Sequence, residues 1–448
     1  MTIKSFLYEL ALDIMGKGYR NQYRELRDVV SSGQISEFIK SKLTKLLLHA
    51  YNNTKYYREV LSELGTVEGK VNLENFNKIP ILKKDIIRKR FSELLSRDYK
   101  TRKWYYQISG GSTGEPVKLV QDHYYSGWVK ATLRYYYRSM LGIDEIASKK
   151  VILWGSMRDI IKASDLKSRI EFWLTNTKFL NSFRMTPEDI LRYIRVINSF
   201  KPVLVRGYAG ALYEVCRIAE KKGIRLHSPK AVVSESEVLT EEMRELVETA
   251  FNTKVYNYYG SREVSAIAGE CDEGNMHIFA FNNYLEVIKP DGRPAKEGEE
   301  GYVILTPLHN YSMPLIRYEI KDVAVVGPDR CKCGNPLPTL KQILGRSSYY
   351  FVKKDGTLVH GLYFIRQLRV RDWVKAFQVI QEDYELIRIK VVVDGEIDKR
   401  DVNEIEERIR SVMGRSCEIE WEFVDEIELP VSGKYLHSRS LIYDQMAS

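Results

Sequence analysis

The sequence predicts an α/β fold: a large N-terminal domain with mixed sheets covered by helices, a β-rich subdomain within it, and a small α+β C-terminal domain. Short apolar runs such as "KVILWGS" and "PVLVRGY" alternate with helix-like stretches from about residue 150. Alternating β and α units of this kind are typical of a largely parallel sheet. From about residue 276, apolar and polar residues alternate around the turn "PDGRP", which indicates antiparallel hairpins.

The length predicts more than one domain. A chain of 448 residues, of which 44% are hydrophobic, exceeds what one core supports, so we expect two domains. The change of pattern at "GRSS", residues 345–348, places them at 1–344 and 345–448. Within the first, apolar residues recur at helical spacing over about 1–100, which predicts a helical start, and the β-rich subdomain covers about 276–344.

The C-terminal region has the pattern of a compact α+β module. Asp355-Gly356 predicts the turn of a hairpin, and two β segments follow it. A charged helix is expected over 398–414 and a final strand over 417–424. In the first domain, Thr186 with Asp189 predicts a capping box at the start of a helix.

Charge and hydropathy limit the partners. The formal net charge is +9, but basic and acidic residues are interleaved, which favours a solvated surface over a nucleic-acid-binding stripe. No window holds the 18 or more apolar residues of a membrane span, and the first 25 residues lack the apolar core of a signal peptide. We therefore expect a soluble, cytoplasmic protein that has no membrane span and does not bind nucleic acid.

Four residues have the side-chain types of a metal site. Five residues separate Cys271 from His277, and Cys331 and Cys333 form a Cys-x-Cys-Gly turn. Three thiolates and one imidazole complete the tetrahedral shell of a structural zinc ion, although free thiols beside a solvated histidine have the same spacing. The other cysteines, Cys216 and Cys417, fit buried positions as small hydrophobic residues.

The stretch "SGGSTGEPV" at 109–117 is small and nearly neutral. Its glycines let the backbone approach a ligand, and its hydroxyls and amides can donate hydrogen bonds to an anion. No Lys-Ser or Lys-Thr follows the last glycine, so it is not a Walker loop. Taken alone, the stretch equally suits a surface turn.

Five blocks in order resemble the superfamily of adenylate-forming enzymes, within it the phenylacetate-CoA ligase-like group, and especially its CapK-like branch of capsule biosynthesis. The resemblance covers roughly residues 40 to 440. The blocks are "SGGSTGEPV" at 109–117, "NYYGSREVSAIAGEC" at 257–271, "MPLIRYEIKDVA" at 313–324, "GRSSYYFVKKDGTLVHGLYF" at 345–364 and "LPVSGKYLHSRS" at 429–440.

The resemblance implies a reaction in which a carboxylic acid joins the α-phosphate of ATP, pyrophosphate leaves, and the acyl group passes to an acceptor, expected to be coenzyme A. It implies that Glu263 holds Mg²⁺, that Asp322 binds the ribose, and that Arg346 lies near ribose or phosphate. Lys434, on a mobile lid domain at 345–448, would be catalytic. The phosphate loop would comprise Ser109, Gly110, Gly111, Ser112, Thr113 and Gly114.

Further residues follow from the same blocks. Tyr259 and Gly260 are expected near adenine, and Ser236 and Glu237 are expected to border the nucleotide, although a core or cap role suits these four equally. Some phenylacetate-CoA ligase-like proteins carry a matching Cys, His and Cys-x-Cys set, which favours zinc over free thiols.

Two departures from the family pattern bear on the second half of the reaction. Many relatives have a lysine where this chain has Glu115, and the hinge block usually has Asp where this chain has Ser348. An alternative acceptor is therefore an amine or hydroxyl of a sugar or cell-envelope precursor. A second alternative is a catalytically silent nucleotide-binding protein.

Overall fold

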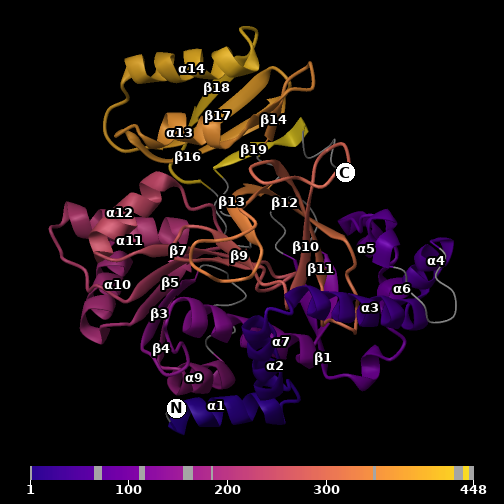
Figure 1. Cartoon of the computed structure of the whole chain (residues 1–448). Coiled ribbons are helices and arrows are strands. Elements are labelled where there is room, and N and C mark those ends of the chain that lie inside the picture. Colours follow the sequence, from indigo (N-terminus) through magenta and orange to yellow (C-terminus); the bar gives the residue numbers. More distant parts are fainter. Residues whose placement is uncertain are drawn as a thin grey trace. The chain divides into compact units, whose positions relative to one another are not determined.

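The computed structural model describes residues 3–64, 73–109, 117–154, 165–182, 185–346, 350–427 and 437–442. These residues form two compact units: the first ends at Leu344 and the second begins at Gly345 (Figure 1).

The first unit begins with helices, as the apolar spacing predicts. In α3, Leu43, Leu46 and Leu47 lie on one face and are buried in the core. The elements of this region are α1 (Ile3–Ile14), α2 (Tyr19–Ser32), α3 (Ile35–Asn53), α4 (Lys55–Glu63), η1 (Leu73–Lys78), α5 (Lys84–Lys89), α6 (Phe91–Leu94) and η2 (Tyr99–Thr101). A hairpin follows, formed by β1 (Trp104–Ile108) and β2 (Lys118–Asp122), and then α7 (His123–Tyr135), which continues as the π-helix η3 (Tyr136–Met140).

The alternating region forms the parallel part of a large sheet. Neighbouring strands in the order β4, β3, β5, β6, β7 all pair in parallel. The capping box expected at Thr186 and Asp189 is present at the start of α10. The elements are β3 (Lys150–Trp154), α9 (Leu166–Leu174), β4 (Thr177–Asn181), α10 (Pro187–Phe200), β5 (Leu204–Tyr208), α11 (Ala209–Lys221), β6 (Ala231–Glu235), α12 (Glu241–Phe251) and β7 (Val255–Tyr259).

The β-rich region continues the same sheet and does not form one of its own. The β8–β9 hairpin pairs antiparallel with β7 on one side and with β13 on the other, so the strands from β3 to β13 form one sheet of eleven strands. The hairpins expected around "PDGRP" are confirmed by the antiparallel pairs β10–β11 and β11–β12. The strands are β8 (Ala268–Glu270), β9 (Met276–Ile278), β10 (Asn283–Ile288), β11 (Glu300–Pro307), β12 (Tyr318–Val326) and β13 (Thr339–Arg346).

Helices cover the parallel strands on two sides. Inward residues of α10, α11 and α12 pack on one face, with Val151, Val205 and Val232 of the strands. The other face packs against α7 and η3, where Tyr136 meets Tyr258. The fold class is therefore the mixed α/β arrangement that the sequence predicts.

The second unit has a four-stranded sheet with two helices. The expected hairpin is confirmed, because β14 and β15 pair antiparallel around the turn at Asp355-Gly356. The strand over 417–424 is not the last one: Ser438–Ser440 forms β19, which pairs parallel with β16. The elements are β14 (Tyr350–Val352), β15 (Leu358–His360), α13 (Leu362–Arg369), β16 (Val374–Asp383), β17 (Leu386–Val393), α14 (Lys399–Met413), β18 (Glu418–Phe423) and β19.

Candidate functional site

Two of the predicted nucleotide segments follow the carboxyl ends of neighbouring parallel strands. Ser236 comes directly after β6, and Gly260 directly after β7. Ser236 has a φ of 71°, a left-handed conformation that a non-glycine residue adopts at a cost. The Glu237 carboxylate accepts a hydrogen bond from the backbone N–H of Gly210 at 2.7 Å, which fixes the segment against α11. Ligands of open α/β sheets bind at this edge.

A hydrogen bond joins two predicted nucleotide residues from distant strands. The Tyr259 hydroxyl, at the end of β7, donates to Asp322 Oδ2 in β12 at 2.6 Å. The sequence separates these residues by more than sixty positions, and the sheet brings them together. Arg346 ends β13, and its side chain is not among those described.

Glu263 lies in the turn between β7 and β8 and is buried. Its Oε1 is 3.4 Å from Nζ of Lys84, a buried lysine at the start of α5. The backbone carbonyl of Glu263 accepts a hydrogen bond from Gln121 Nε2 at 3.1 Å. Sequence reasoning missed Lys84, because one lysine in "ILKKDIIRK" resembles an ordinary surface lysine until the chain is folded.

The described part of the glycine stretch closes the β1–β2 hairpin. Ser109 is buried; its backbone N–H donates to the Val117 carbonyl at 2.9 Å, and its hydroxyl accepts from the Val117 N–H at 2.7 Å. Gly110, Gly111, Ser112, Thr113, Gly114 and Glu115 lie outside the described residues, as do Ser348 and Lys434.

An ion pair between a buried glutamate and a partly buried arginine, also missed by sequence reasoning, lies on the same sheet. The Arg206 guanidinium of β5 makes a bidentate pair with the Glu235 carboxylate of β6, through Nε and through Nη2 at 2.8 Å. The guanidinium carbon is 5.6 Å from the ring centre of Trp154 and 5.7 Å from that of Tyr258. Burial disfavours the charge of Arg206, but the adjacent Glu235 carboxylate raises its pKa well above the ordinary value. The sequence feature that could have predicted this ion pair is the single arginine inside the apolar run "PVLVRGY".

We expect Glu235→Ala to destabilise the protein by about 1–3 kcal/mol, because it leaves the partly buried Arg206 guanidinium without its partner. Chemical denaturation of both proteins measures the difference. The matched control is Asp291→Ala, which removes an exposed pair with Arg293 and should cost less than about 1 kcal/mol. Equal losses in the two variants would contradict this account of the pair.

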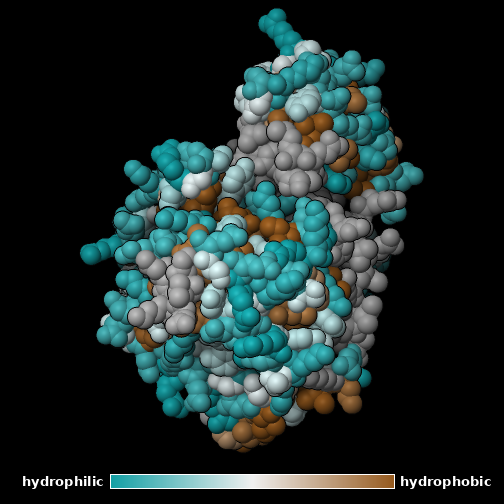
Figure 2. Space-filling model, turned by 90° about the vertical axis from the view of Figure 1, so that its right-hand side faces the viewer, coloured by the Kyte–Doolittle hydropathy of each residue, from teal (hydrophilic) through white to brown (hydrophobic). Residues whose placement is uncertain are grey.

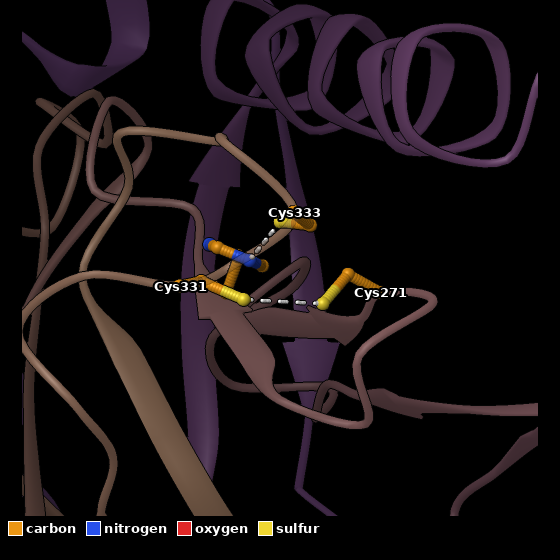
Figure 3. Close-up of side chains that lie close together, drawn as sticks. Cys271, Cys331 and Cys333 are labelled. Atoms are coloured by element: carbon orange, nitrogen blue, oxygen red, sulfur yellow. Dashed lines mark hydrogen bonds between the residues drawn. The ribbon is translucent and has the colours of Figure 1, made fainter.

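The four candidate metal ligands, Cys271, His277, Cys331 and Cys333, lie together in the structure. The β8–β9 hairpin carries Cys271 and His277, and the segment after β12 carries Cys331 and Cys333. Their ligand atoms all lie within 4.8 Å of one another, and Figure 3 shows the three thiols gathered together. Cys271 Sγ is 3.6 Å from Cys331 Sγ. Gly334, with a φ of 79°, makes the turn that follows the second pair.

The donor chemistry of this cluster fits a zinc ion. His277 Nδ1 is 3.0 Å from the Leu337 carbonyl, which can only accept, so Nδ1 carries the proton. The lone pair is then on Nε2, which is 3.2 Å from Cys333 Sγ and faces the thiols. A metal-binding histidine is commonly oriented by such a hydrogen bond to its other nitrogen. The remaining cysteines, Cys216 and Cys417, are buried as expected.

Comparison with known proteins finds similarity to a CapK protein and to phenylacetate-coenzyme A ligases. Residues 351–438 match the family described as the CapK C-terminal domain. Protein CapK of Staphylococcus aureus is 24% identical over 446 residues, which cover 95% of each chain. A phenylacetate-coenzyme A ligase of Thermus thermophilus is 26% identical over 330 residues, 68% of this chain and 69% of that protein.

Solved structures share the fold. A 2-hydroxyisobutyryl-CoA ligase in its postadenylation state, in complex with 2-HIB-AMP, aligns with a TM-score of 0.69 at 17% identity, over 91% of this chain and 90% of that one. A benzoate CoA ligase from Burkholderia xenovorans aligns with a TM-score of 0.51 at 17% identity, over 74% and 66%. The sequence relatives support the superfamily of adenylate-forming enzymes and its CapK-like branch for this chain, and the solved structures show that it has the fold of adenylate-forming ligases.

Proposed function

We propose that this protein activates a carboxylic acid as an acyl adenylate, with release of pyrophosphate from ATP, and transfers the acyl group to coenzyme A. The observation that carries the proposal is the Tyr259–Asp322 hydrogen bond at 2.6 Å. Tyr259 is the last residue of β7, and Gly260 follows it at the carboxyl end of that strand. It joins residues that the family resemblance assigns to the nucleotide, in a fold shared with acyl-CoA ligases. The phenylacetate-coenzyme A ligases among the relatives support coenzyme A as the acceptor.

In this proposal the nucleotide is held by groups of complementary chemistry. The Asp322 carboxylate accepts hydrogen bonds from the ribose hydroxyls, and the Tyr259 ring borders adenine. Ser236 and Glu237 line the same edge of the sheet, and the loop from Ser109 to Gly114 donates hydrogen bonds to the outer phosphates.

Glu263 offers the carboxylate oxygens that Mg²⁺ prefers; it is buried, and its Oε1 lies 3.4 Å from the ammonium of Lys84. A single carboxylate together with substrate phosphates is the usual environment of protein-bound Mg²⁺, which neutralises phosphate charge when bound. Lys84 fixes the position of this carboxylate. Many relatives have a lysine in the phosphate loop where this chain has Glu115. In this chain Lys84, beside Glu263, is a basic side chain that could take the place of that lysine.

Lys434 and Arg346 supply the remaining positive charge in the proposal. A carboxylate must approach the α-phosphate, and the two anions repel each other. An ammonium placed between them lowers the energy of the transition state, where negative charge is shared among carboxyl and phosphate oxygens. Arg346 would bind ribose or phosphate oxygens.

The Cys271, His277, Cys331 and Cys333 cluster is proposed to hold one structural zinc ion. Four protein ligands close the shell and leave no position for a reacting water. The ion would tie the β8–β9 hairpin to the segment after β12, and so stabilise the part of the sheet that joins β7 to β13.

The acyl acceptor can be tested against a second class, an amine or hydroxyl group. The alignment with protein CapK covers 95% of each chain, and Ser348 departs from the hinge pattern, so transfer to an amine or hydroxyl of an envelope precursor is the rival outcome. Product analysis with coenzyme A present and absent separates the two. An acyl thioester that forms only with coenzyme A supports the first acceptor.

Exchange of labelled pyrophosphate into ATP, screened over a panel of carboxylic acids, tests the first half-reaction without assuming an acceptor. We expect exchange that depends on both the acid and Mg²⁺. If no acid supports exchange and ATP still binds, the protein is a silent nucleotide-binding member of the family.

We expect Asp322→Ala to raise the KM for ATP by about ten- to a hundred-fold, because hydrogen bonds to a charged acceptor are lost. The KM for the acid should change little. Tyr259→Phe removes the Tyr259–Asp322 hydrogen bond but keeps the carboxylate, and Asp329→Ala serves as a surface control. If Tyr259→Phe raises the KM for ATP as much as Asp322→Ala does, the carboxylate acts by supporting the tyrosine and does not bind ribose.

A further inference from the structure

Helix α1 turns its apolar stripe away from the body of its unit. On a helix, these stripe residues fall within an arc about 100° wide. The stripe consists of Ile3, Phe6, Leu7 and Ile14, which are 81%, 43%, 45% and 71% exposed. The opposite face, which is buried, carries Ser5, Glu9 and Leu12. An ordinary surface helix has the reverse arrangement, with its apolar stripe against the core.

A buried ion pair fixes this orientation. Glu9 Oε1 is 3.2 Å from Nη2 of Arg134, whose side chain is 2% exposed on α7. Rotating α1 to bury its apolar stripe would withdraw Glu9 and leave the buried arginine charge to its longer pair with Asp144 at 3.6 Å, which is costly. The exposed stripe is therefore built into the fold.

Helix α9 adds a second apolar stripe beside the first. Leu166, Ile170 and Trp173 recur at helical spacing and are 69%, 51% and 63% exposed. The helices are held together by Lys4, whose Nζ donates to the Trp173 carbonyl at 3.3 Å, and by Tyr8, whose hydroxyl donates to Glu171 at 2.9 Å. Figure 1 shows α1 and α9 side by side at the bottom of the view, and Figure 2 shows apolar surface at that end.

Cations accompany the exposed aromatic rings of this surface. Lys4 Nζ is 4.3 Å from the ring centre of Trp173, and the Arg20 guanidinium carbon is 5.4 Å from that of Phe6. Nearby acids are engaged by cations: Asp13 pairs with Arg20 at 3.0 Å and Glu171 with Lys130 at 3.0 Å. Exposed Arg169 adds positive charge on α9. Asp165, which precedes the first residue of that helix, is an exposed acidic residue of the same surface.

We propose that α1 and α9 form a surface that binds the interface of an anionic lipid bilayer, with both helices lying along it. Aliphatic side chains, a tryptophan and basic residues on neighbouring helices are the combination that enters the boundary between headgroups and acyl chains. Lysine is depleted in the cores of protein interfaces, whereas Lys4 lies between the two stripes. None of the described helices is long and apolar enough to cross a membrane.

Vesicle flotation in the absence of substrates tests this proposal independently of the ligase activity. The full chain is mixed with vesicles of phosphatidylcholine alone, or of phosphatidylcholine and phosphatidylglycerol in equal parts. We expect binding to the anionic vesicles to exceed binding to neutral ones. The double variant Leu7→Ser, Ile170→Ser should bind the anionic vesicles at least roughly tenfold more weakly than the unaltered protein, because two apolar side chains no longer enter the interface.

The matched control is Val370→Ser, which changes a residue that is 64% exposed in the other unit and should bind like the unaltered protein. Circular dichroism and melting temperature verify that the variants fold. The proposal is overturned if the chain does not float with anionic vesicles, or if the double variant floats as well as the control. It is also overturned if light scattering detects a lipid-free dimer that the double variant dissociates, since the surface would then be an interface between two copies.

Discussion

Replacing Lys434 with alanine is expected to lower the rate of acyl-adenylate formation by about a hundred- to a thousand-fold, the usual cost of one group that stabilises transition-state charge. The lysine is proposed to lie between the acid and the α-phosphate only during reaction, so kcat should fall far more than the KM for ATP rises. Pyrophosphate exchange measures this half-reaction alone. Folding should be unaffected, which melting temperature verifies.

Lys399→Ala is the control for this substitution, because Lys399 is an exposed lysine on α14 of the same unit. It should leave the exchange rate unchanged. If Lys434→Ala retains exchange but loses acyl transfer, the lysine serves the second half-reaction. A variant that retains both half-reactions would contradict the proposed role.

Among the substitutions considered, disrupting the Cys271, His277, Cys331 and Cys333 cluster is expected to lower the free energy of unfolding the most. Elemental analysis of the purified chain should give one zinc per molecule. Cys271→Ser should lose the metal and destabilise the protein by more than about 4 kcal/mol, in the range where metal loss falls among single substitutions. The reason is that the proposed zinc ion would join two segments, those of Cys271 and Cys331, that are sixty residues apart in sequence.

Cys216→Ala provides the comparison, because Cys216 is a buried thiol outside the cluster. It should keep the full zinc content even where it reduces stability. Treatment with a chelator should lower the melting temperature of the unaltered protein and of Cys216→Ala, but not that of Cys271→Ser. A metal-free preparation with unchanged melting behaviour would exclude the structural zinc.

Local patterns predicted much of the fold, because each element carries its own signals. The Thr186–Asp189 capping box starts α10, and the Asp355-Gly356 turn joins β14 to β15. The charged helix expected over 398–414 is α14. Such features depend on neighbours in the sequence, so one chain suffices to find them.

Other features depend on long-range contacts that a single sequence does not encode locally. The β-rich region joins the parallel strands through β8 and β9, two three-residue strands too short to show a pattern. Ser438–Ser440 has no strand-forming side chains and becomes β19 only by pairing with β16. The helical pattern of α1 is visible in the sequence, but the choice of its buried face depends on Arg134 in α7.

The candidate site shows the same division. The resemblance identified Tyr259 and Asp322 as separate motifs, and only the folded sheet shows that they share a hydrogen bond. Lys84 and Arg206 were missed because each is a single basic residue without a motif, and each becomes notable only through a buried carboxylate partner.

The most direct test of the proposed chemistry follows the oxygen atoms of the acid. An active acid from the exchange screen is prepared with heavy oxygen in its carboxylate and converted to product with ATP and acceptor, and the released AMP is examined by mass spectrometry. If a carboxyl oxygen attacks the α-phosphorus, one heavy oxygen must remain on AMP when the acyl group leaves. AMP without the label, or label in inorganic phosphate, would contradict an acyl adenylate as the intermediate.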